Sequence, residues 1–103
     1  MVAEEQRRVI RLRDEIGPIL ANRDQGDTIF RTLHDSMGNG RERLVVDFSG
    51  VEVVTSAFAD ESLGKLLDCW GPESFKGRIQ VVGLDRNNGA IVALVLRRRR
   101  PTK

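Results

Sequence analysis

The sequence has few of the side chains that most enzymes use for chemistry, with one histidine, one cysteine and no tyrosine among its 103 residues. General acid–base and nucleophilic catalysis depend largely on such groups, so we do not expect an enzyme. The chain also lacks a Gly-x-Ser-x-Gly motif, a phosphate-binding glycine loop with lysine and a cluster of metal ligands. We therefore expect no cofactor and no bound metal. His34 has no second ligand near it and is expected at a surface or half-buried helix position.

Cysteine and long apolar runs are scarce as well. The single cysteine, Cys69, cannot form an internal disulfide, which favours a reducing cytoplasm and a structural thiol over a redox sensor. No apolar run is long enough to cross a membrane, and residues 1–8, acidic and then basic, do not have the pattern of a signal peptide. We therefore expect a cytoplasmic protein with no membrane partner.

The charge distribution argues against a nucleic-acid-binding domain. The net charge of +2 depends on the run Arg97–Arg100, without which the rest of the chain is slightly acidic. Nucleic-acid-binding surfaces usually combine widely spread basic charge with aromatic side chains for stacking, whereas this chain has four Phe and one Trp. A solvated basic tail over residues 97–103, at the C-terminal end of a helix, explains the run best, and binding of nucleic acid or acidic lipid is the alternative.

Three segments have the pattern of β-strands. Residues 7–14 alternate loosely between apolar and polar side chains, which predicts a partly exposed strand that ends before Gly17 and Pro18. Residues 43–48 form a continuous apolar and β-branched run, typical of an inner strand covered on both faces. Residues 78–84 predict the third strand.

The segments between these strands have helical spacing. Asn22 and Gln25 form a variant of the capping box at the start of the first helix, and the glycines of GNG at 38–40 end it. The second helix is predicted to begin at Ala57 and to end at the Gly-Pro pair at 71–72.

The last segment, residues 87–100, is predicted to be a helix capped by Asn87 or Asn88, although its β-branched content leaves a strand as the alternative. Strands that alternate with helices predict one domain over residues 1–103, a small α/β sandwich in the order β-α-β-α-β-α with helices packed on a mixed or parallel sheet. The side chains expected to face the core are Ile29, Phe30, Leu33 and Met37 in the first helix, Ala59, Leu63, Leu66, Leu67 and Trp70 in the second, and Ile91, Leu94 and Val95 in the last.

Thr55 and Ser56 are two small hydroxyl residues at the point where an apolar run gives way to a helix. Such residues are most simply N-caps, worth about 1 kcal/mol of stability. Contact with a partner is the second interpretation, and regulatory phosphorylation is the third. Asp60 and Glu61 are expected to complement the helix dipole, and Phe58 is expected in the core, with a partner role as the second interpretation for all three.

The segment VVDFSGVEVVTSAFADESLGKLL, residues 45–67, and the upstream NRDQG, residues 22–26, resemble the STAS-like domain-of-unknown-function family. The shared features are a strand that ends in Asp-Phe-Ser, a serine-containing turn and a Phe-Ala-Asp-Glu sequence that opens a helix. The wider group is the STAS domain of sulfate transporters and anti-sigma-factor antagonists. The resemblance implies a small cytoplasmic, bacterial regulatory module of strands backed by helices. It also implies a protein partner, either a histidine-kinase-like ATPase or an anti-sigma-type kinase.

The resemblance further implies a set of site residues. The antagonists carry an Asp-Ser-Ser-Gly turn at this junction, and its first serine is the phosphorylated one. Ser56 stands at that position, while Thr55, Ala57 and Phe58 replace the other three residues of the turn. A switch at Ser56 and a docking edge from Ser49 to Glu61 are therefore implied. The implied partner-binding residues are Asp47, Ser49, Thr55, Ser56, Phe58, Asp60 and Glu61.

The main hypothesis is thus a non-enzymatic protein-interaction module that acts in signal transduction. One alternative is a nucleic-acid-associated accessory protein that uses the arginine run at its C-terminal end. Another is a small-ligand sensor with an anion site at Arg23 and Ser56, near the starts of two predicted helices. For Arg23 itself, a solvated position in the first helical turn is the simpler interpretation. A homodimer is left open.

Overall fold

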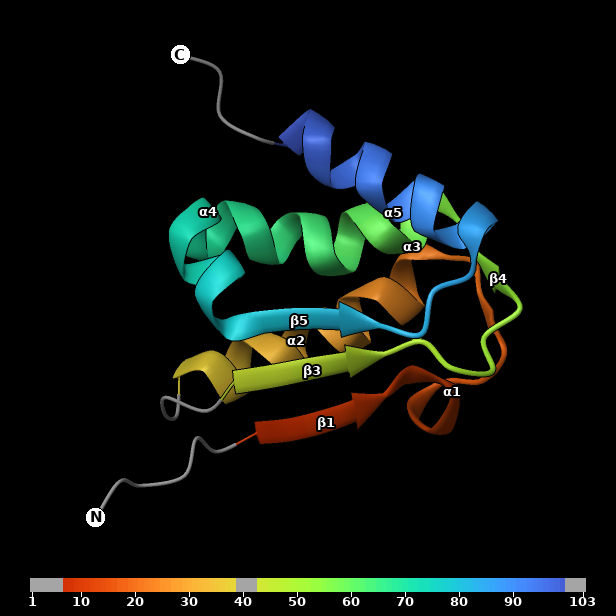
Figure 1. Cartoon of the computed structure of the whole chain (residues 1–103), viewed down its shortest axis with the longest axis horizontal. Coiled ribbons are helices and arrows are strands. Elements are labelled where there is room, and N and C mark those ends of the chain that lie inside the picture. Colours follow the sequence, from red (N-terminus) through yellow and green to blue (C-terminus); the bar gives the residue numbers. More distant parts are fainter. Residues whose placement is uncertain (1–6, 39–42, 100–103) are drawn as a thin grey trace.

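The computed structural model describes residues 7–38 and 43–99, and Figure 1 shows how their helices and strands are arranged. The predictions made for residues 1–6, for residues 39–40 and for the end of the basic tail at 100–103 lie outside the described residues.

Three parallel strands form the main sheet: β1 (Arg7–Arg11), β3 (Arg43–Asp47) and β5 (Ile79–Val82). Their order is β1-β3-β5, so β3 is the central strand, as its apolar run predicted. Helices connect the strands and pack on the sheet. The predicted small α/β fold is confirmed.

β1 is shorter than predicted because the chain leaves the sheet at Leu12. The strand prediction was wrong for residues 12–14, which belong to α1 (Leu12–Glu15). β3 ends at Asp47, the residue paired with Arg11, so the residues that follow Arg11 have no neighbouring strand to bond. Leu12 is completely buried, and the turn places this side chain in the core.

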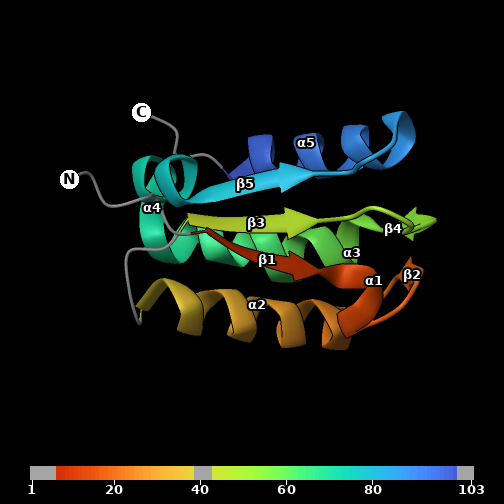
Figure 2. The same ribbon diagram turned by 60° about the horizontal axis from the view of Figure 1, so that its bottom comes forward.

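A second, two-stranded sheet lies beyond the carboxyl ends of the main strands (Figure 2). It pairs β2 (Ile19–Leu20) in parallel with β4 (Val53–Val54). The N–H of Thr55 extends this pairing by donating to the carbonyl oxygen of Leu20 at 2.9 Å. β2 was not predicted, because two residues are too few for a periodic pattern to show.

α2 (Arg23–Gly38) begins with the predicted capping box. The N–H of Gln25 donates to Oδ1 of Asn22 at 2.9 Å, and the N–H of Asn22 donates to Oε1 of Gln25 at 3.1 Å. These bonds satisfy backbone groups at and near the start of the helix. The inward side of the helix is as predicted, with Ile29, Leu33 and Met37 buried and Phe30 half-buried.

α3 (Ser56–Ala59), the π-helical turn η1 (Asp60–Gly64) and α4 (Lys65–Arg78) follow one another directly. The prediction that this helix ends at the Gly-Pro pair was only partly right. Gly71 has φ 84° and ψ 159°, which kinks the helix, but residues 72–78 continue as a further helical segment. Proline fits the first position of that segment, since its missing N–H is not needed there. Ala59, Leu63, Leu66 and Leu67 are buried as predicted, and Trp70 is half-buried.

α5 (Arg86–Arg99) is a helix, so the strand alternative for this segment is wrong. Its N-terminal cap is Asp85 rather than Asn87 or Asn88, because Oδ1 of Asp85 accepts from the N–H of Asn88 at 2.8 Å. The side chain of Asn88 is buried instead, where its Oδ1 accepts from the N–H of Val54 at 3.1 Å. Val95 is buried and Ile91 half-buried, but Leu94 is 43% exposed and Val92 takes the core position in its place.

α2 and α4 pack on one face of the main sheet, and Figure 2 shows α3 and α4 behind its strands. Along β3, burial alternates: Leu44 and Val46 are fully buried, whereas Arg43, Val45 and Asp47 are half-buried. The prediction that this strand is covered on both faces was therefore wrong for the second face. The core lies between the sheet and the helices on the first face.

Candidate functional site

Thr55 occupies the junction between β4 and α3 and caps the helix. Its backbone is extended, with φ −95° and ψ 161°, and its Oγ1 accepts a hydrogen bond from the N–H of Phe58 at 3.3 Å. The same hydroxyl donates to the carbonyl oxygen of Ala21 at 2.7 Å. Thr55 therefore fixes the start of α3 against the segment that leads into α2.

Ser56 is the first residue of α3, and its side chain is exposed. Its hydroxyl makes no hydrogen bond within residues 7–38 and 43–99. The sequence suggested N-capping for both hydroxyl residues, and the structure assigns that role to Thr55. The hydroxyl of Ser56 is thus available at the surface, at the place where the family resemblance puts a switch.

A hollow of about 290 Å³ lies beside Ser56. It brings together three elements far apart in the sequence, because α2, the α3–η1 segment and α5 meet there. Two arginines and one carboxylate line it, and Arg98 makes no ion pair with any residue that the structure describes. The lining residues are Arg23, Ser56, Ala57, Asp60, Val95 and Arg98.

Asp60 joins two helices at the edge of this hollow. Arg99 of α5 donates to its two carboxylate oxygens from Nε at 2.9 Å and from Nη2 at 3.1 Å, and Nη1 of Arg99 also pairs with Asp68. Arg23 of α2 donates to Asp60 at 3.3 Å. Hydrogen bonds from Arg99 first, and from Arg23 second, lower the pKa of Asp60, and the bond to Asp60 in turn raises the pKa of Arg99. Asp60 is therefore held in its charged form.

Glu61 makes a second set of ion pairs. Nζ of Lys65 lies 3.0 Å from Oε2 of Glu61, and Nη1 of Arg23 lies 3.2 Å from Oε1. Lys65 is the main cause of the lowered pKa of Glu61. The sequence suggested that Asp60 and Glu61 complement the dipole at the helix start. That prediction was wrong, because the first turn of α3 contains no acidic residue. Asp60 and Glu61 form ion pairs that link α2, η1 and α5.

Phe58 is completely buried. It belongs to the core, as the simpler interpretation held, and its inclusion among the partner-binding residues was wrong. The alternation between exposed Ser56 and buried Phe58 follows from helix geometry, since residues two positions apart do not share a helix face.

Asp47 and Ser49 form a separate group at the end of β3. Oδ1 of Asp47 accepts from the N–H of Ser49 at 2.9 Å, and Nε of Arg11 lies 3.8 Å from Oδ2. Hydrogen bonds from the hydroxyl and N–H of Ser49 lower the pKa of Asp47. Gly83, with φ +81°, packs against this turn, since a Cβ there would lie 2.6 Å from the nitrogen of Ser49. Among the described residues, no hydrogen bond or ion pair joins this group to Ser56.

The arginine run lies at the C-terminal end of a helix, as predicted, and Arg97 and Arg98 are exposed, but Arg99 is not a solvated residue. Arg97, Arg98 and Arg99 are the last residues of α5, and Arg99 has 25% of its side chain exposed because it pairs with the two aspartates. Arg98 lines the Ser56 hollow, which the sequence analysis missed. The one feature of the sequence that could have predicted this position is spacing. Arg98 follows the buried Val95 by three positions and therefore lies on nearly the same helix face.

The remaining residues singled out in the sequence have structural surroundings. His34 is half-buried between Phe30 and Trp70, with ring centroids 5.3 and 5.5 Å away, and Cys69 is exposed. Within the described ranges, no three His, Cys, Asp or Glu side chains are grouped so that they could hold a metal ion. No helix in the part of the chain that the structure covers is long and apolar enough to span a membrane.

The fold and the junction together define a class: a small parallel α/β module with an exposed serine at the start of the helix that follows β4. The chain belongs to the family described as STAS-like domain of unknown function (DUF4325), whose model matches residues 25–88, more than half of the chain. Searches of the curated proteins and of the solved structures gave no match. The matched range contains the Ser56 junction but not Arg23 or the last turn of α5.

Proposed function

We propose that this chain is a non-enzymatic regulatory module that docks a protein partner through the surface around Ser56. The observation that carries the proposal is the exposed hydroxyl of Ser56, which makes no hydrogen bond to any described residue. Thr55 caps the helix, so Ser56 has no structural role within the described residues, yet it is exposed beside a hollow lined by two arginines. The resemblance to anti-sigma-factor antagonists supports a partner with the histidine-kinase-like ATPase fold.

The charges around Ser56 support its use as a switch. A phosphate on its hydroxyl would lie near the first N–H groups of α3 and beside Arg98, which makes no ion pair with a described residue. Arg23 is already engaged by Asp60 and Glu61, so of the two arginines in the lining Arg98 is the one without an ion pair to a described residue. We expect phosphorylation to change the charge that the partner meets without unfolding the module.

The partner is identified first. The tagged full chain is purified from its own host, and the captured proteins are identified by mass spectrometry. An ATPase or kinase of the histidine-kinase-like fold is the expected partner. Reproducible capture of proteins from other classes alone would contradict this part of the proposal.

The docking surface is tested with two substitutions at Ser56. Ser56→Asp adds a charge at the proposed surface, and we expect binding to the captured partner to weaken by about tenfold or more with an unchanged melting temperature. Ser56→Ala adds no charge and should bind like wild type in its unphosphorylated state. Ser74→Asp is the matched control, because Ser74 is an exposed serine on α4 outside the Ser56 hollow. Wild-type binding by Ser56→Asp would refute the docking surface.

A further inference from the structure

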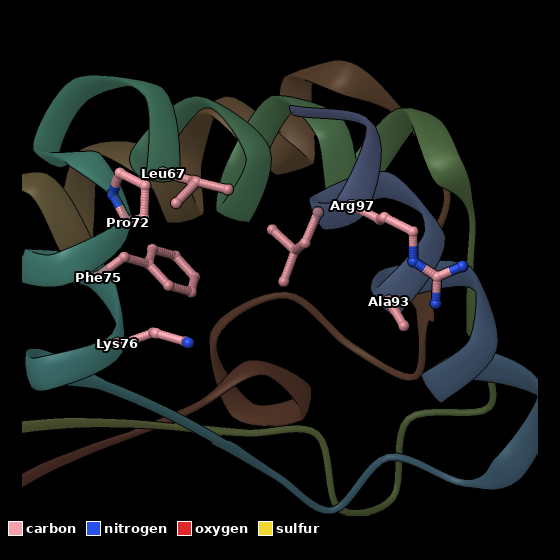
Figure 3. A pocket seen from close by; sticks show the side chains of 7 residues that line it. Leu67, Pro72, Phe75, Lys76, Ala93 and Arg97 are labelled. Carbon is pink, nitrogen blue, oxygen red and sulfur yellow. The ribbon is translucent and has the colours of Figure 1, made fainter. Parts of the chain in front are cut away.

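A second hollow lies between residues 72–78 and α5 (Figure 3), and it shares no lining residue with the Ser56 hollow. Its volume is about 280 Å³. Figure 3 shows Pro72, Phe75 and Lys76 on the side of α4, and Ala93 and Arg97 on the side of α5. Its lining is apolar apart from two cations, and consists of Leu67, Pro72, Phe75, Lys76, Ala93, Leu96 and Arg97.

The kink at Gly71 shapes this hollow. The positive φ of Gly71 changes the direction of the chain, and residues 72–78 then form one wall. Phe75 and Leu67 are 8% and 6% exposed, so the apolar surface inside the hollow is continuous with the core. Ala93 contributes only a methyl group from the other wall, which leaves the space open.

The two cations in the lining have no charged partner among the described residues. Neither Lys76 nor Arg97 makes an ion pair or a hydrogen bond with any residue in the described ranges, and no acidic residue lines the hollow. Apolar surface with uncompensated positive charge beside it complements a molecule that has a negative group at one end and a hydrocarbon body.

We propose that this hollow binds a free monocarboxylic acid with an apolar body, such as a medium-chain fatty acid. The carboxylate lies between Lys76 and Arg97, and the hydrocarbon chain lies against Phe75, Leu67 and Leu96. The volume of about 280 Å³ is just below the range of about 300–1,000 Å³ for small-molecule sites, which suits a short ligand better than a long-chain lipid. Ala93, Leu96 and Arg97 lie outside the range matched by the family model.

A chain-length series tests the apolar contact. Hexanoate, octanoate and decanoate, kept below their micelle-forming concentrations, are titrated into the full-length protein and followed by amide chemical shifts. We expect saturable binding of one molecule per chain, up to about fourfold tighter for each added methylene, with the largest shifts around Phe75 and Ala93. Binding that does not saturate, or shifts that map to other elements, would overturn the proposal.

The charge requirement is tested with a neutral ligand and a double variant. Octanol should bind about tenfold more weakly than octanoate to the wild type. The Lys76→Gln/Arg97→Gln variant should lose that difference, binding octanoate as weakly as octanol. Arg98→Gln is the matched control, because Arg98 is the next residue on α5 but lines the Ser56 hollow, and it should keep the preference for octanoate. Equal binding of octanol and octanoate to the wild type would refute a carboxylate site.

A blocking variant tests the location. Ala93 is exposed, so Ala93→Trp places a large side chain over the hollow without entering the core. We expect octanoate binding to be lost while the circular dichroism spectrum and melting temperature stay close to wild type. A folded Ala93→Trp protein that binds octanoate normally would show that the site is elsewhere.

Discussion

Thr55 and Ser56 are adjacent and chemically alike, yet they have different surroundings. The hydroxyl of Thr55 accepts from the N–H of Phe58 and donates to the carbonyl oxygens of Ala21 and, at a longer 3.5 Å, Leu20. The hydroxyl of Ser56 has no partner among the described residues. Their roles differ because an N-cap residue has an extended backbone, which Thr55 has. Ser56 is the next residue and is already helical, so its side chain is not placed to cap the helix.

This difference predicts unequal effects of two alanine substitutions on the free energy of unfolding. Thr55→Ala should lower the free energy of unfolding by about 1–2 kcal/mol, because it removes the cap and leaves the partly buried N–H of Phe58 without its partner. Ser56→Ala should change it by less than about 0.5 kcal/mol. Urea unfolding of both variants measures the two values, and Thr55→Ser, which keeps the hydroxyl, is the control. Equal losses for both alanine variants would show that the serine shares the capping role.

At the scale of elements, α2 approaches the α3–η1 segment closely at Gly26. A Cβ at this buried glycine would lie 2.7 Å from Cβ of Glu61 and 2.9 Å from the carbonyl oxygen of Phe58. The absence of a side chain therefore lets α2 lie close enough for Arg23 to reach Asp60 and Glu61.

Gly26→Ala is expected to destabilise the fold, although alanine favours helices. The overpacking should cost about 1–3 kcal/mol, which exceeds the gain of up to about 1 kcal/mol in helix propensity. Gly77→Ala is the matched control, because a Cβ at Gly77 would meet nothing within 4 Å, and it should leave stability unchanged or raise it. Chemical unfolding of the two variants checks the prediction, and a stabilised Gly26→Ala protein would contradict it.

Sequence patterns within a few residues predicted most of the helices and strands. They could not predict the contacts between elements that lie far apart in the sequence. The capping box at Asn22 and Gln25 was visible because its partners are three positions apart. Asp85 lies two positions before the predicted start of the last helix, where propensity cannot separate neighbouring polar residues. The pair between Arg99 and Asp60 joins residues 39 positions apart, and no periodic pattern records such a contact.

At the scale of the whole molecule, the three arginines in the last turn of α5 have three different surroundings. Arg97 lines the apolar hollow, Arg98 lines the Ser56 hollow, and Arg99 pairs with Asp60 and Asp68. Consecutive helical residues point in directions about 100° apart, which is why a run of identical side chains does not act as one basic patch. The sequence suggested a single tail because it shows the run but not the surfaces around it.

The ion pairs of Asp60 and Glu61 and the hydrogen bonds that Ser49 donates to Asp47 predict that stability depends on pH. The pKa of each carboxyl is lowered in the folded protein, from ordinary values of 3.8 for the aspartates and 4.5 for the glutamate. A lowered pKa means that the unfolded chain binds protons more readily than the folded one. The stabilisation is therefore present above the ordinary values and is lost as pH falls through the lower folded values. We expect the free energy of unfolding to decrease between about pH 5 and pH 2.

Arg99→Gln tests how much of this dependence belongs to the contact between α5 and η1. Because Arg99 is the main cause of the lowered pKa of Asp60, the variant should be less stable at neutral pH, by roughly 1–2 kcal/mol, and should lose less of its stability on acidification. Arg86→Gln is the control, because Arg86 is exposed at the other end of α5 and makes no ion pair with a described residue. Urea unfolding at a series of pH values measures both slopes. If Arg99→Gln keeps the wild-type slope, Asp60 does not depend on Arg99 for its charge, and the link between the two helices rests on packing alone.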